Sequence, residues 1–578
     1  MNFFKDMQKR WVMEQEGNRR QVLQLAEALQ VDEVLSNMLV QRGVTNFEEA
    51  RYFFRPDMGH LHDPFLMQDM EKAVLRIEKA IFNKEKILIY GDYDVDGTTA
   101  VSVVYQFFKQ RYEHIGFYIP NRYTEGYGIS TAGIDFAAEH HFSLIIALDC
   151  GIKSVDKVIY AGKRSIGFII CDHHLPGAEL PDAVAVLDPK RRDCLYPYKE
   201  LSGCGIGFKL IQAYAEKNNI PWEEVSCYLD LVAVSIACDL VHINGENRTL
   251  AAFGLEKLNN NPSIGLKALM DVAGKSENYT VSDLVFTIGP RINAAGRIDD
   301  AKHAVNLLIA DCTTAAFDHG EFINLKNTER KEHDLSITGQ ALNMIDQDPL
   351  LINRRSTVVY QENWHKGVIG IVASRLTEKY YRPTVVLTKS NGYVTGSARS
   401  VYGFDLYEAL CGCSDLLLQF GGHKYAAGLT LLPENVPAFS ERFEQVVASV
   451  ITEEQLVQRI EIDAEINLNQ ITPKFFRILK QFAPFGPENM TPVFLTKNVY
   501  VSGNINLVGA NHLKICIVQE GSPIFSCIGF GLGEYISVLK NSMPFDICYT
   551  IEENVWNNQK TLQLNLKGIS INQELPTA

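Results

Sequence analysis

Five short apolar runs between residues 86 and 187 constrain the fold of this chain most strongly. They are Lys86–Tyr90, Gly116–Ile119, Leu144–Leu148, Ile166–Ile170 and Ala183–Leu187. Segments long enough for helices separate them, such as Thr99–Arg111 and Ile134–His140. Strands that are apolar at nearly every position and alternate with helices are typical of a parallel sheet covered on both faces. We therefore expect an α/β domain here.

Acidic and imidazole side chains follow three of these strands directly. They are Asp92, Asp94 and Asp96 after the first strand, Asp149 after the third, and Asp172-His173-His174 after the fourth. A further acid, Asp239, ends the apolar helical segment Leu229–Leu240. Ligands of open parallel sheets bind outside the carboxyl ends of the strands, so we expect these side chains to converge. Closely spaced carboxylates repel one another unless cations neutralise them. The alternative is that these residues form no common site and that each lies in a solvated turn or caps a helix, independently of the others.

A second α/β pattern runs from about residue 350 to residue 450. Strand-like runs occur at Ser356–Tyr360 and Pro383–Leu387, and a glycine-bearing loop from Trp364 leads into a helix, where free backbone N–H groups can hold an anion. The run Gly421-Gly422-His423 would let a backbone approach a phosphate closely. A structural role for His423 is the alternative.

The last part of the chain reads as many short strands with a Pro/Gly-rich joint at residues 483–488. The expected strands are Arg459–Ile466, Val493–Thr496, Val499–Ile505, Leu513–Val518, Ile524–Phe530, Phe545–Glu552 and Thr561–Ile569. This pattern predicts a small OB-like β-barrel. The strands carry no clear stripe of aromatic and basic residues, so the pattern does not say what the barrel binds.

The chain is too long for one hydrophobic core, and we expect a multidomain α/β protein. A long helical pattern from Ala301 to Ile345 predicts a connecting helix and, with it, a cleft between two domains. The expected divisions are a helical N-terminal preface (1–80) packed on the domain after it, a parallel-sheet domain with the metal centre (81–300), the connecting helix (301–347), a smaller α/β domain (348–450) and the barrel (455–570).

Composition limits the cellular setting of the protein. A net charge of −14 argues against non-specific coating of nucleic acid but does not exclude a nuclease whose carboxylates bind cations. The twelve cysteines are scattered without a CxxC pair, which is typical of a reduced compartment. The start, Met1–Asp6, lacks a signal-peptide pattern, and no apolar run approaches the roughly 18 residues of a membrane span. We expect a cytoplasmic protein that does not bind membranes.

The motifs in sequence order resemble those of the DHH phosphoesterase superfamily, and within it the RecJ branch of bacterial exonucleases specific for single-stranded DNA. The resemblance rests on Gly91–Gly97, Asp149, Asp172-His173-His174, Asp239, Gly289–Arg297 and Gly421–Gly428. It covers nearly the whole chain. It implies that the smaller α/β domain is of the DHHA1 type and that the barrel is an OB fold. Some relatives carry histidine where this chain has Tyr90, so Asp92 is expected to take over part of that role.

The chemistry of these side chains predicts a centre for two ions, Mn²⁺ or Mg²⁺. The expected ligands are Asp94, Asp96, Asp149, His173 and Asp239, with Asp149 between the two ions and Asp92 as an additional ligand. Asp92 and His174 are the expected catalytic residues. The resemblance implies that Arg399, Ser400 and His423 hold the substrate. Arg291 and Arg297 are expected to contact phosphate, the alternative being a loop in which they pair with Asp299 and Asp300.

The leading hypothesis is a metal-dependent exonuclease that releases mononucleotides from single-stranded DNA by two-metal activation of water. The resemblance implies digestion from the 5′ end, a role in recombination and repair, and helicases or single-strand-binding proteins as candidate partners. A narrow cleft would exclude duplex DNA. One alternative is a phosphoesterase for short oligonucleotides or cyclic dinucleotides, against which the barrel argues. Another is a non-catalytic DNA-binding protein, against which the intact set of acids argues.

Overall fold

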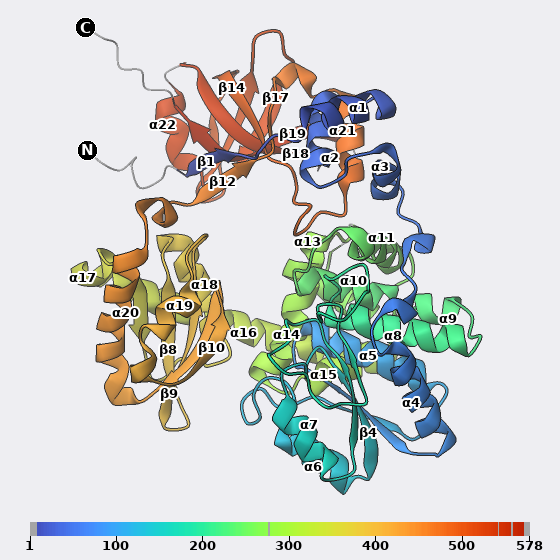
Figure 1. Cartoon of the computed structure of the whole chain (residues 1–578). Coiled ribbons are helices and arrows are strands. Elements are labelled where there is room, and N and C mark those ends of the chain that lie inside the picture. Colours follow the sequence, from blue (N-terminus) through green and yellow to red (C-terminus); the bar gives the residue numbers. More distant parts are fainter. Residues whose placement is uncertain (1–8, 276–277, 541–542, 557–558, 572–578) are drawn as a thin grey trace. The chain divides into compact units, whose positions relative to one another are not determined.

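The computed structural model describes residues 9–275, 278–540, 543–556 and 559–571. These residues form two compact units (Figure 1). The central unit contains residues 55–332 and 483–490, and the terminal unit contains residues 1–54, 333–482 and 491–578. The segment 1–80 is therefore divided, because residues 9–54 pack with the carboxyl-terminal part of the chain and residues 55–80 pack with the central unit. Met1–Asp6 lies outside the described residues.

A five-stranded sheet forms the framework of the central unit, and every pairing in it is parallel. Its order is β3-β2-β4-β5-β6. The strands are β2 (Lys86–Gly91), β3 (Ile115–Tyr118), β4 (Phe142–Leu148), β5 (Gly167–Cys171) and β6 (Ala185–Leu187). Each expected strand is present within two residues of its predicted ends. The parallel α/β prediction is confirmed.

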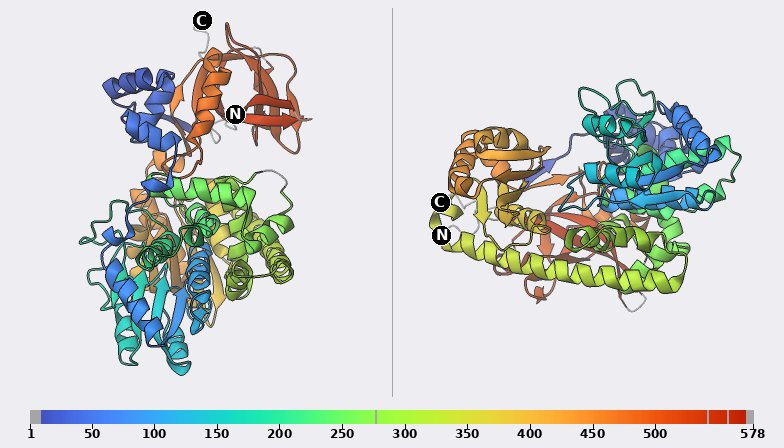
Figure 2. Two further views of the ribbon diagram at one scale, coloured as in Figure 1. Left: turned by 90° about the vertical axis from the view of Figure 1, so that its right-hand side faces the viewer. Right: turned by 90° about the horizontal axis from the view of Figure 1, so that it is seen from below.

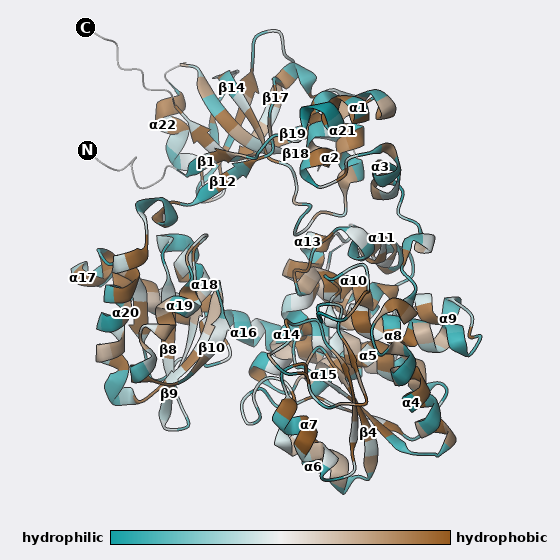
Figure 3. Cartoon of the chain, in the orientation of Figure 1, coloured by the Kyte–Doolittle hydropathy of each residue, from teal (hydrophilic) through white to brown (hydrophobic). Residues whose placement is uncertain are grey.

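Both faces of this sheet are covered, which explains why its strands are apolar throughout. Ile87 and Ile89 face one core together with residues of α4 (Met70–Phe82), α5 (Val95–Lys109) and α8 (Gly203–Lys217). Leu88 and Tyr90 face the other core, with residues of α6 (Thr131–Glu139) and α7 (Val155–Gly162). Figure 3 shows the hydrophobic colour of β4, whose last five residues are buried. Alternate residues of one strand thus serve two cores.

Helices complete the central unit beyond the sheet. They include α10 (Leu229–Cys238), α11 (Gly245–Asn260), α12 (Ile264–Ala273), a π-helix (Leu284–Ile288), α14 (Gly289–Ile298) and α15 (Lys302–Leu308). The segment around Arg291, for which a loop was the alternative, is the helix α14. Pro290 occupies the first turn, where the missing N–H is not needed, and Gly296 lets the helix approach the backbone of Tyr93.

The long helix is present and begins later than expected. The helix α16 runs from Thr313 to Gln347, and residues 309–312 separate it from α15. Neither Gly320 nor Gly339 interrupts it, as the uninterrupted yellow-green helix in Figure 2 shows. No atom but those of its own neighbourhood lies within 4 Å of a Cβ placed at Gly339.

A mixed sheet of order β10-β11-β9-β8-β7 forms the smaller α/β part of the terminal unit. Its strands are β7 (Thr357–Tyr360), β8 (Thr384–Ser390), β9 (Tyr393–Arg399), β10 (Leu417–His423) and β11 (Ala426–Leu431). Only the β7–β8 pair is parallel. The helices α18 (Ile369–Tyr380), α19 (Leu406–Cys411) and α20 (Val436–Val450) accompany the sheet.

The barrel is confirmed at the carboxyl end of the chain. Its strands are β13 (Ala464–Glu465), β14 (Phe494–Val501), β15 (Asn506–Val508), β16 (His512–Val518), β17 (Phe525–Gly529), β18 (Phe545–Trp556) and β19 (Gln559–Ser570). Pairing of β14 with both β18 and β16 closes the sheet on itself. Two expected strands merge into β14, and β15 was not expected. The strand β1 (Arg10–Met13) pairs in parallel with β12 (Arg459–Ile462) beside the barrel.

Within the described parts of the chain, no helix combines the length and the apolar character required to cross a bilayer. The twelve cysteines all lie in those parts and are free thiols.

Candidate metal centre

The predicted acids lie at the carboxyl edge of the parallel sheet, where the chain order reverses. The strand β2 has β3 on one side and β4 on the other, so the connections leave its carboxyl end in opposite directions. This is the position at which open α/β sheets bind ligands. Asp94 caps the amino terminus of α5 by accepting a hydrogen bond from Gly97 N (3.0 Å), and Asp96 lies in the first turn.

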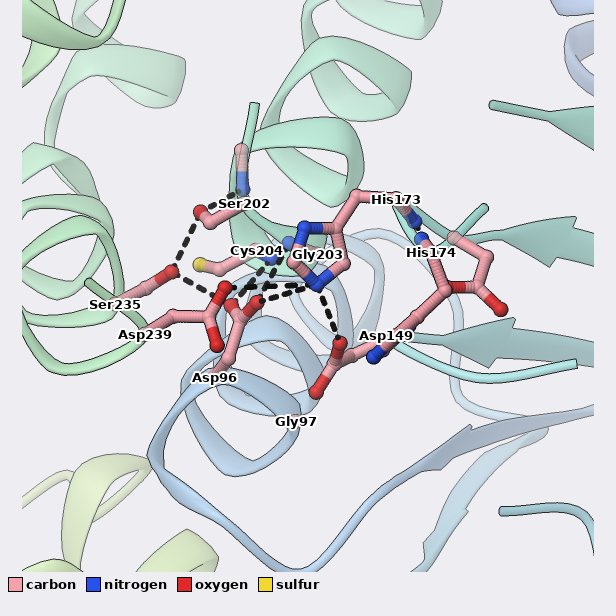
Figure 4. Close-up of polar contacts among 12 residues, drawn as sticks. Asp96, Gly97, Asp149, His173, His174, Ser202, Gly203, Cys204, Ser235 and Asp239 are labelled. Carbon is pink, nitrogen blue, oxygen red and sulfur yellow. Dashed lines mark hydrogen bonds and ion pairs between the residues drawn. The ribbon is translucent and has the colours of Figure 1, made fainter. Parts of the chain in front are cut away.

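His173 lies at the centre of the acidic cluster (Figure 4). Its Nε2 atom is 3.2 Å from Asp149 Oδ1, 3.5 Å from Asp239 Oδ2 and 3.8 Å from Asp96 Oδ2. These four residues come from three strand or helix ends and from α5. His173, Asp149 and Asp96 are buried, whereas Asp239 retains a quarter of its side-chain exposure.

Asp149 has an unusual backbone conformation. Its φ is +59°, in the left-handed region that non-glycine residues rarely adopt, and Gly151 follows at +115°. The backbone N–H of Asp149 donates to Cys171 O (2.9 Å), which ties the turn after β4 to the end of β5. Strained backbone of this kind clusters at functional sites.

Asp172 positions the two histidines that follow it. Its Oδ1 accepts hydrogen bonds from the backbone N–H groups of His173 (2.8 Å) and His174 (3.1 Å), and it contacts His174 Nδ1 at 2.7 Å. Its Oδ2 accepts from Ile152 N (2.9 Å). Burial alone would raise the pKa of Asp172, but these hydrogen bonds, led by that from His174, lower it to about 2. Asp172 is therefore an anion that orients His174.

The other carboxylates of the cluster are electrostatically strained. Burial, followed by the charge of Asp96, raises the pKa of Asp149, Asp239 and Asp94 above the usual range. Burial and then Asp94 raise the pKa of Asp92. Burial lowers the pKa of His173, so its neutral form, which can bind a metal, is favoured. Burial would also lower the pKa of His174, but Asp172 outweighs it and raises that pKa.

The donor set fits a divalent cation. Asp149 Oδ1, Asp92 Oδ2 and both ring nitrogens of His173 are buried and have no hydrogen-bond partner among the described residues. Such atoms are costly unless another group satisfies them. Donor atoms about 2.1 Å from a Mg²⁺-sized ion lie roughly 3 Å apart in adjacent positions, close to the separations around His173. Oxygen donors with one imidazole suit Mn²⁺ or Mg²⁺.

Two overlapping groups of side chains have donor atoms within 4.8 Å of one another. One contains Asp96, His173 and Asp239, and the other contains Asp149, His173 and His174. Neither group includes Asp92 or Asp94, although both are close enough to affect the pKa values of the cluster. His174 is an expected catalytic residue, and its position in the second group also allows it to act as a metal ligand.

Sequence reasoning missed two side chains beside the centre. The Tyr127 hydroxyl lies 3.2 Å from His174 Nε2 and donates to Asp149 O at 3.3 Å. The guanidinium of Arg122 stacks over the ring of Tyr93, 4.8 Å from its centroid, and lowers the pKa of Asp92 and Asp94 against their burial. Both follow β3 at the same edge of the sheet. Ligand-binding residues of parallel sheets follow the carboxyl ends of the strands, and this rule applied to β3 would have identified both side chains.

Arg291 and Arg297 both lie on α14. Arg291 donates from Nε to Asn324 Oδ1 (3.0 Å) and from Nη1 to Thr287 O (2.7 Å). The backbone carbonyl of Arg297 accepts a hydrogen bond from Tyr123. Asp299 forms an ion pair with Lys326, and Asp300 forms one with Lys302.

The remaining predicted residues lie in the terminal unit. Arg399 on β9 and His423 on β10 both pair with Ala426 of β11, which places them in one row across the sheet. Residues directly opposite one another share a face, so both side chains lie on the same side. Ser400 donates its hydroxyl to Phe404 O (3.0 Å) and its backbone N–H to Tyr425 O (3.0 Å).

Known protein families match three stretches of this chain. The DHH family, N-terminal domain, matches residues 86–236, the DHHA1 domain matches residues 353–449, and the RecJ OB domain matches residues 462–568. The predicted fold class, in which a DHH domain, a long helix, a DHHA1 domain and an OB barrel follow one another, is confirmed.

Individual relatives are similar over nearly the whole length. The chain is 37% identical to the single-stranded-DNA-specific exonuclease RecJ of Bacillus subtilis, over 98% of this chain and 71% of that protein. It is 31% identical to the RecJ of Dickeya dadantii, over 93% and 96%. The crystal structure of RecJ in complex with Mn²⁺ from Thermus thermophilus matches with a TM-score of 0.83 at 25% identity, covering 98% of this chain and 80% of that one. This chain therefore belongs to the RecJ family of single-stranded-DNA-specific exonucleases.

Proposed function

We propose that this protein is a metal-dependent exonuclease that hydrolyses single-stranded DNA to mononucleotides from the 5′ end, in recombination and repair. The observation that carries the proposal is the cluster around His173, in which Asp149 Oδ1 and both ring nitrogens of His173 lack hydrogen-bond partners among the described residues, in a chain 37% identical to a single-stranded-DNA-specific exonuclease. The metal is Mn²⁺ or Mg²⁺, bound as two ions.

The residues that would hold the ions are Asp94, Asp96, Asp149, His173 and Asp239, with Asp149 between the two ions and Asp92 beside them. Burial and, after it, mutual repulsion raise the pKa values of Asp92, Asp94, Asp149 and Asp239, and a bound cation would favour their charged forms. When bound, the ions supply Lewis-acid activation of water and neutralise charge on the phosphoryl oxygens.

His174 acts on the substrate as a hydrogen-bond donor. Asp172 holds its Nδ1 atom at 2.7 Å, which fixes the ring, and the raised pKa increases the fraction that carries a second proton. A protonated Nε2, 3.2 Å from the Tyr127 hydroxyl, can donate to a phosphoryl or leaving oxygen. The side chain is 43% exposed, so a substrate can reach it.

The substrate strand is held by arginines and by the two smaller domains. Arg291 and Arg297 of α14 contact phosphate in the central unit, and Arg399, Ser400 and His423 contact the nucleotide in the terminal unit. The proposed functional parts of the chain are residues 81–300, 301–347, 348–450 and 455–570, preceded by the N-terminal segment 1–80. The OB barrel is the proposed additional binding surface for the strand. A helicase or a single-strand-binding protein is the proposed partner class.

The test is digestion of single-stranded oligonucleotides labelled at either end, with Mn²⁺, Mg²⁺ or EDTA. The informative variant is Asp149→Asn, because asparagine tolerates the left-handed backbone at this position while removing the charge. Wild type should release labelled mononucleotide from the 5′ end, and EDTA and Asp149→Asn should each abolish release.

Asp182→Ala, which removes an exposed carboxylate outside the cluster, is the control and should digest as wild type does. Duplex DNA and RNA of the same sequence test strand selectivity. Turnover of dinucleotides without digestion of long strands would replace the proposal with a small-substrate phosphoesterase.

A further inference from the structure

We propose that Ser235, Ser202 and the first turn of α8 form a positioning device that sets the orientation of the Asp96 carboxylate. The inference rests on the metal centre proposed above and goes beyond it, because none of these residues is itself an expected ligand. Figure 4 shows Ser202, Cys204 and Ser235 beside Asp96, and all three are buried.

Asp96 accepts three short hydrogen bonds. Gly203 N donates to Oδ2 at 2.6 Å, whereas Cys204 N (2.8 Å) and Ser235 Oγ (2.6 Å) donate to Oδ1. The two amides open α8, where backbone N–H groups have no partner within the helix and the helix dipole favours an anion. The carboxylate is 1% exposed, so water does not compete for these positions.

A chain of hydroxyl groups extends this contact. The hydroxyl oxygens of Ser235 and Ser202 are 2.6 Å apart, and Ser202 Oγ accepts from Gly205 N at 3.0 Å. Ser235 Oγ is placed to donate to Ser202 Oγ as well as to Asp96 Oδ1, but it carries one hydrogen. We assign that hydrogen to the charged carboxylate, and the hydrogen between the two serines to Ser202. The order of donation is thus Gly205, Ser202, Ser235 and Asp96, and each bond polarises the next.

Ser235 also contacts a second acid of the cluster. Its backbone carbonyl accepts the N–H of Asp239 at 2.9 Å, at the end of α10. Ser235 therefore bonds both to the Asp96 carboxylate on α5 and to the backbone of Asp239 at the end of α10. The first turn of α8 supplies the other two hydrogen bonds to Asp96. Rotation of the Asp96 carboxylate would break at least one of three bonds. Its Oδ2 is therefore held toward His173 Nε2, 3.8 Å away, before a metal arrives.

The test is the affinity of the metal-free full-length protein for Mn²⁺, measured by isothermal titration calorimetry. Ser235→Ala should raise the dissociation constant roughly tenfold or more, as expected for loss of a group that orients a metal ligand. Ser102→Ala is the matched control, because Ser102 is an equally buried helical serine whose hydroxyl bonds only Thr98 O (2.7 Å). The dissociation constant of this control should equal that of wild type.

Equal affinities of Ser235→Ala and Ser102→Ala would overturn the inference while leaving the metal centre intact. Failure of wild type to bind Mn²⁺ would instead overturn the metal centre. Ser202→Ala provides a second variant if Ser235→Ala does not fold. It should raise the dissociation constant by less than Ser235→Ala, because the Ser235–Asp96 bond persists without its support. An unchanged constant in Ser202→Ala would contradict the proposed order of donation.

Discussion

Gly203 leaves no room for a side chain between α8 and the acidic cluster. A Cβ atom at this position would lie 2.5 Å from Asp149 Cβ and 2.9 Å from Asp149 Oδ1. Atoms this close overlap, so a side chain at position 203 would displace Asp149, which is an expected metal ligand. The close approach of α8 is also what allows Gly203 N to reach Asp96 at 2.6 Å.

Gly203→Ala should therefore abolish Mn²⁺ binding measured by calorimetry and lower exonuclease activity by about 100-fold or more, since misplacement by about 1 Å has effects of that size. Gly162→Ala is the control. It changes a glycine of α7 whose added Cβ meets no atom within 4 Å. Normal Mn²⁺ affinity in Gly203→Ala would show that Asp149 does not need its present position.

A second prediction at this scale concerns Asp69, which accepts hydrogen bonds from Lys72 (2.7 Å) and Arg191 (2.8 Å). Burial would raise the pKa of Asp69, but Lys72 and Arg191 lower it below its ordinary value of 3.8. A lowered folded-state pKa stabilises the protein above the ordinary pKa, and this stabilisation is lost as the pH falls through the lowered value. Asn tolerates the left-handed backbone of this residue (φ +66°), so the substitution tests the charge alone.

Asp69→Asn should lower the free energy of unfolding of the central unit by about 1–2 kcal/mol at pH 7. The difference from wild type should persist down to about pH 5 and shrink below about pH 4, where Asp69 protonates. Urea unfolding of both proteins at several pH values measures it. A difference that grows on acidification would contradict the assigned sign.

At the scale of elements, the helix α16 contains a glycine that its surroundings do not require. No atom lies within 4 Å of a Cβ added at Gly339, and the position is in the interior of a 35-residue helix. Gly339→Ala should stabilise this helix by about 0.5–1 kcal/mol, because glycine loses more backbone entropy than alanine. Slower hydrogen exchange of the α16 amides would show the effect, and faster exchange would contradict it.

The elements predicted best are those whose signal is local. The strands of the parallel sheet are apolar at nearly every position, and several end directly before a predicted site residue. The sequence alone therefore predicted that Asp96, Asp149 and His173 lie close together. Asn506–Val508 is too short to show a period, so β15 was missed. The hydroxyl contacts of Ser235 depend on how helices pack, and no spacing in the sequence encodes them.

At the scale of the whole molecule, the two compact units should respond differently to metal. All expected ligands lie in the central unit, so Mn²⁺ should stabilise that unit alone. At 100 times its dissociation constant, a ligand that binds only the folded state adds about 2.7 kcal/mol. Differential scanning calorimetry with Mn²⁺ and with EDTA should show one transition that moves and one that does not.

Asp149→Asn should remove the Mn²⁺-dependent shift without changing the other transition. Movement of both transitions by Mn²⁺ in wild type would mean that the units unfold together or that the terminal unit binds metal as well.

The pairing of β1 with β12 has a consequence for synthesis of the chain on the ribosome. The residues of β1 are translated before those of β12, because Arg459 follows its partner Arg10 by about 450 residues. At about 5–20 residues per second, that interval is roughly 20–90 s. During this interval residues 55–332 can fold, whereas β1 is unpaired because β12 has not yet been synthesised. A nascent chain released before β12 emerges therefore keeps the backbone groups of β1 open to any other strand, which links incomplete translation to aggregation.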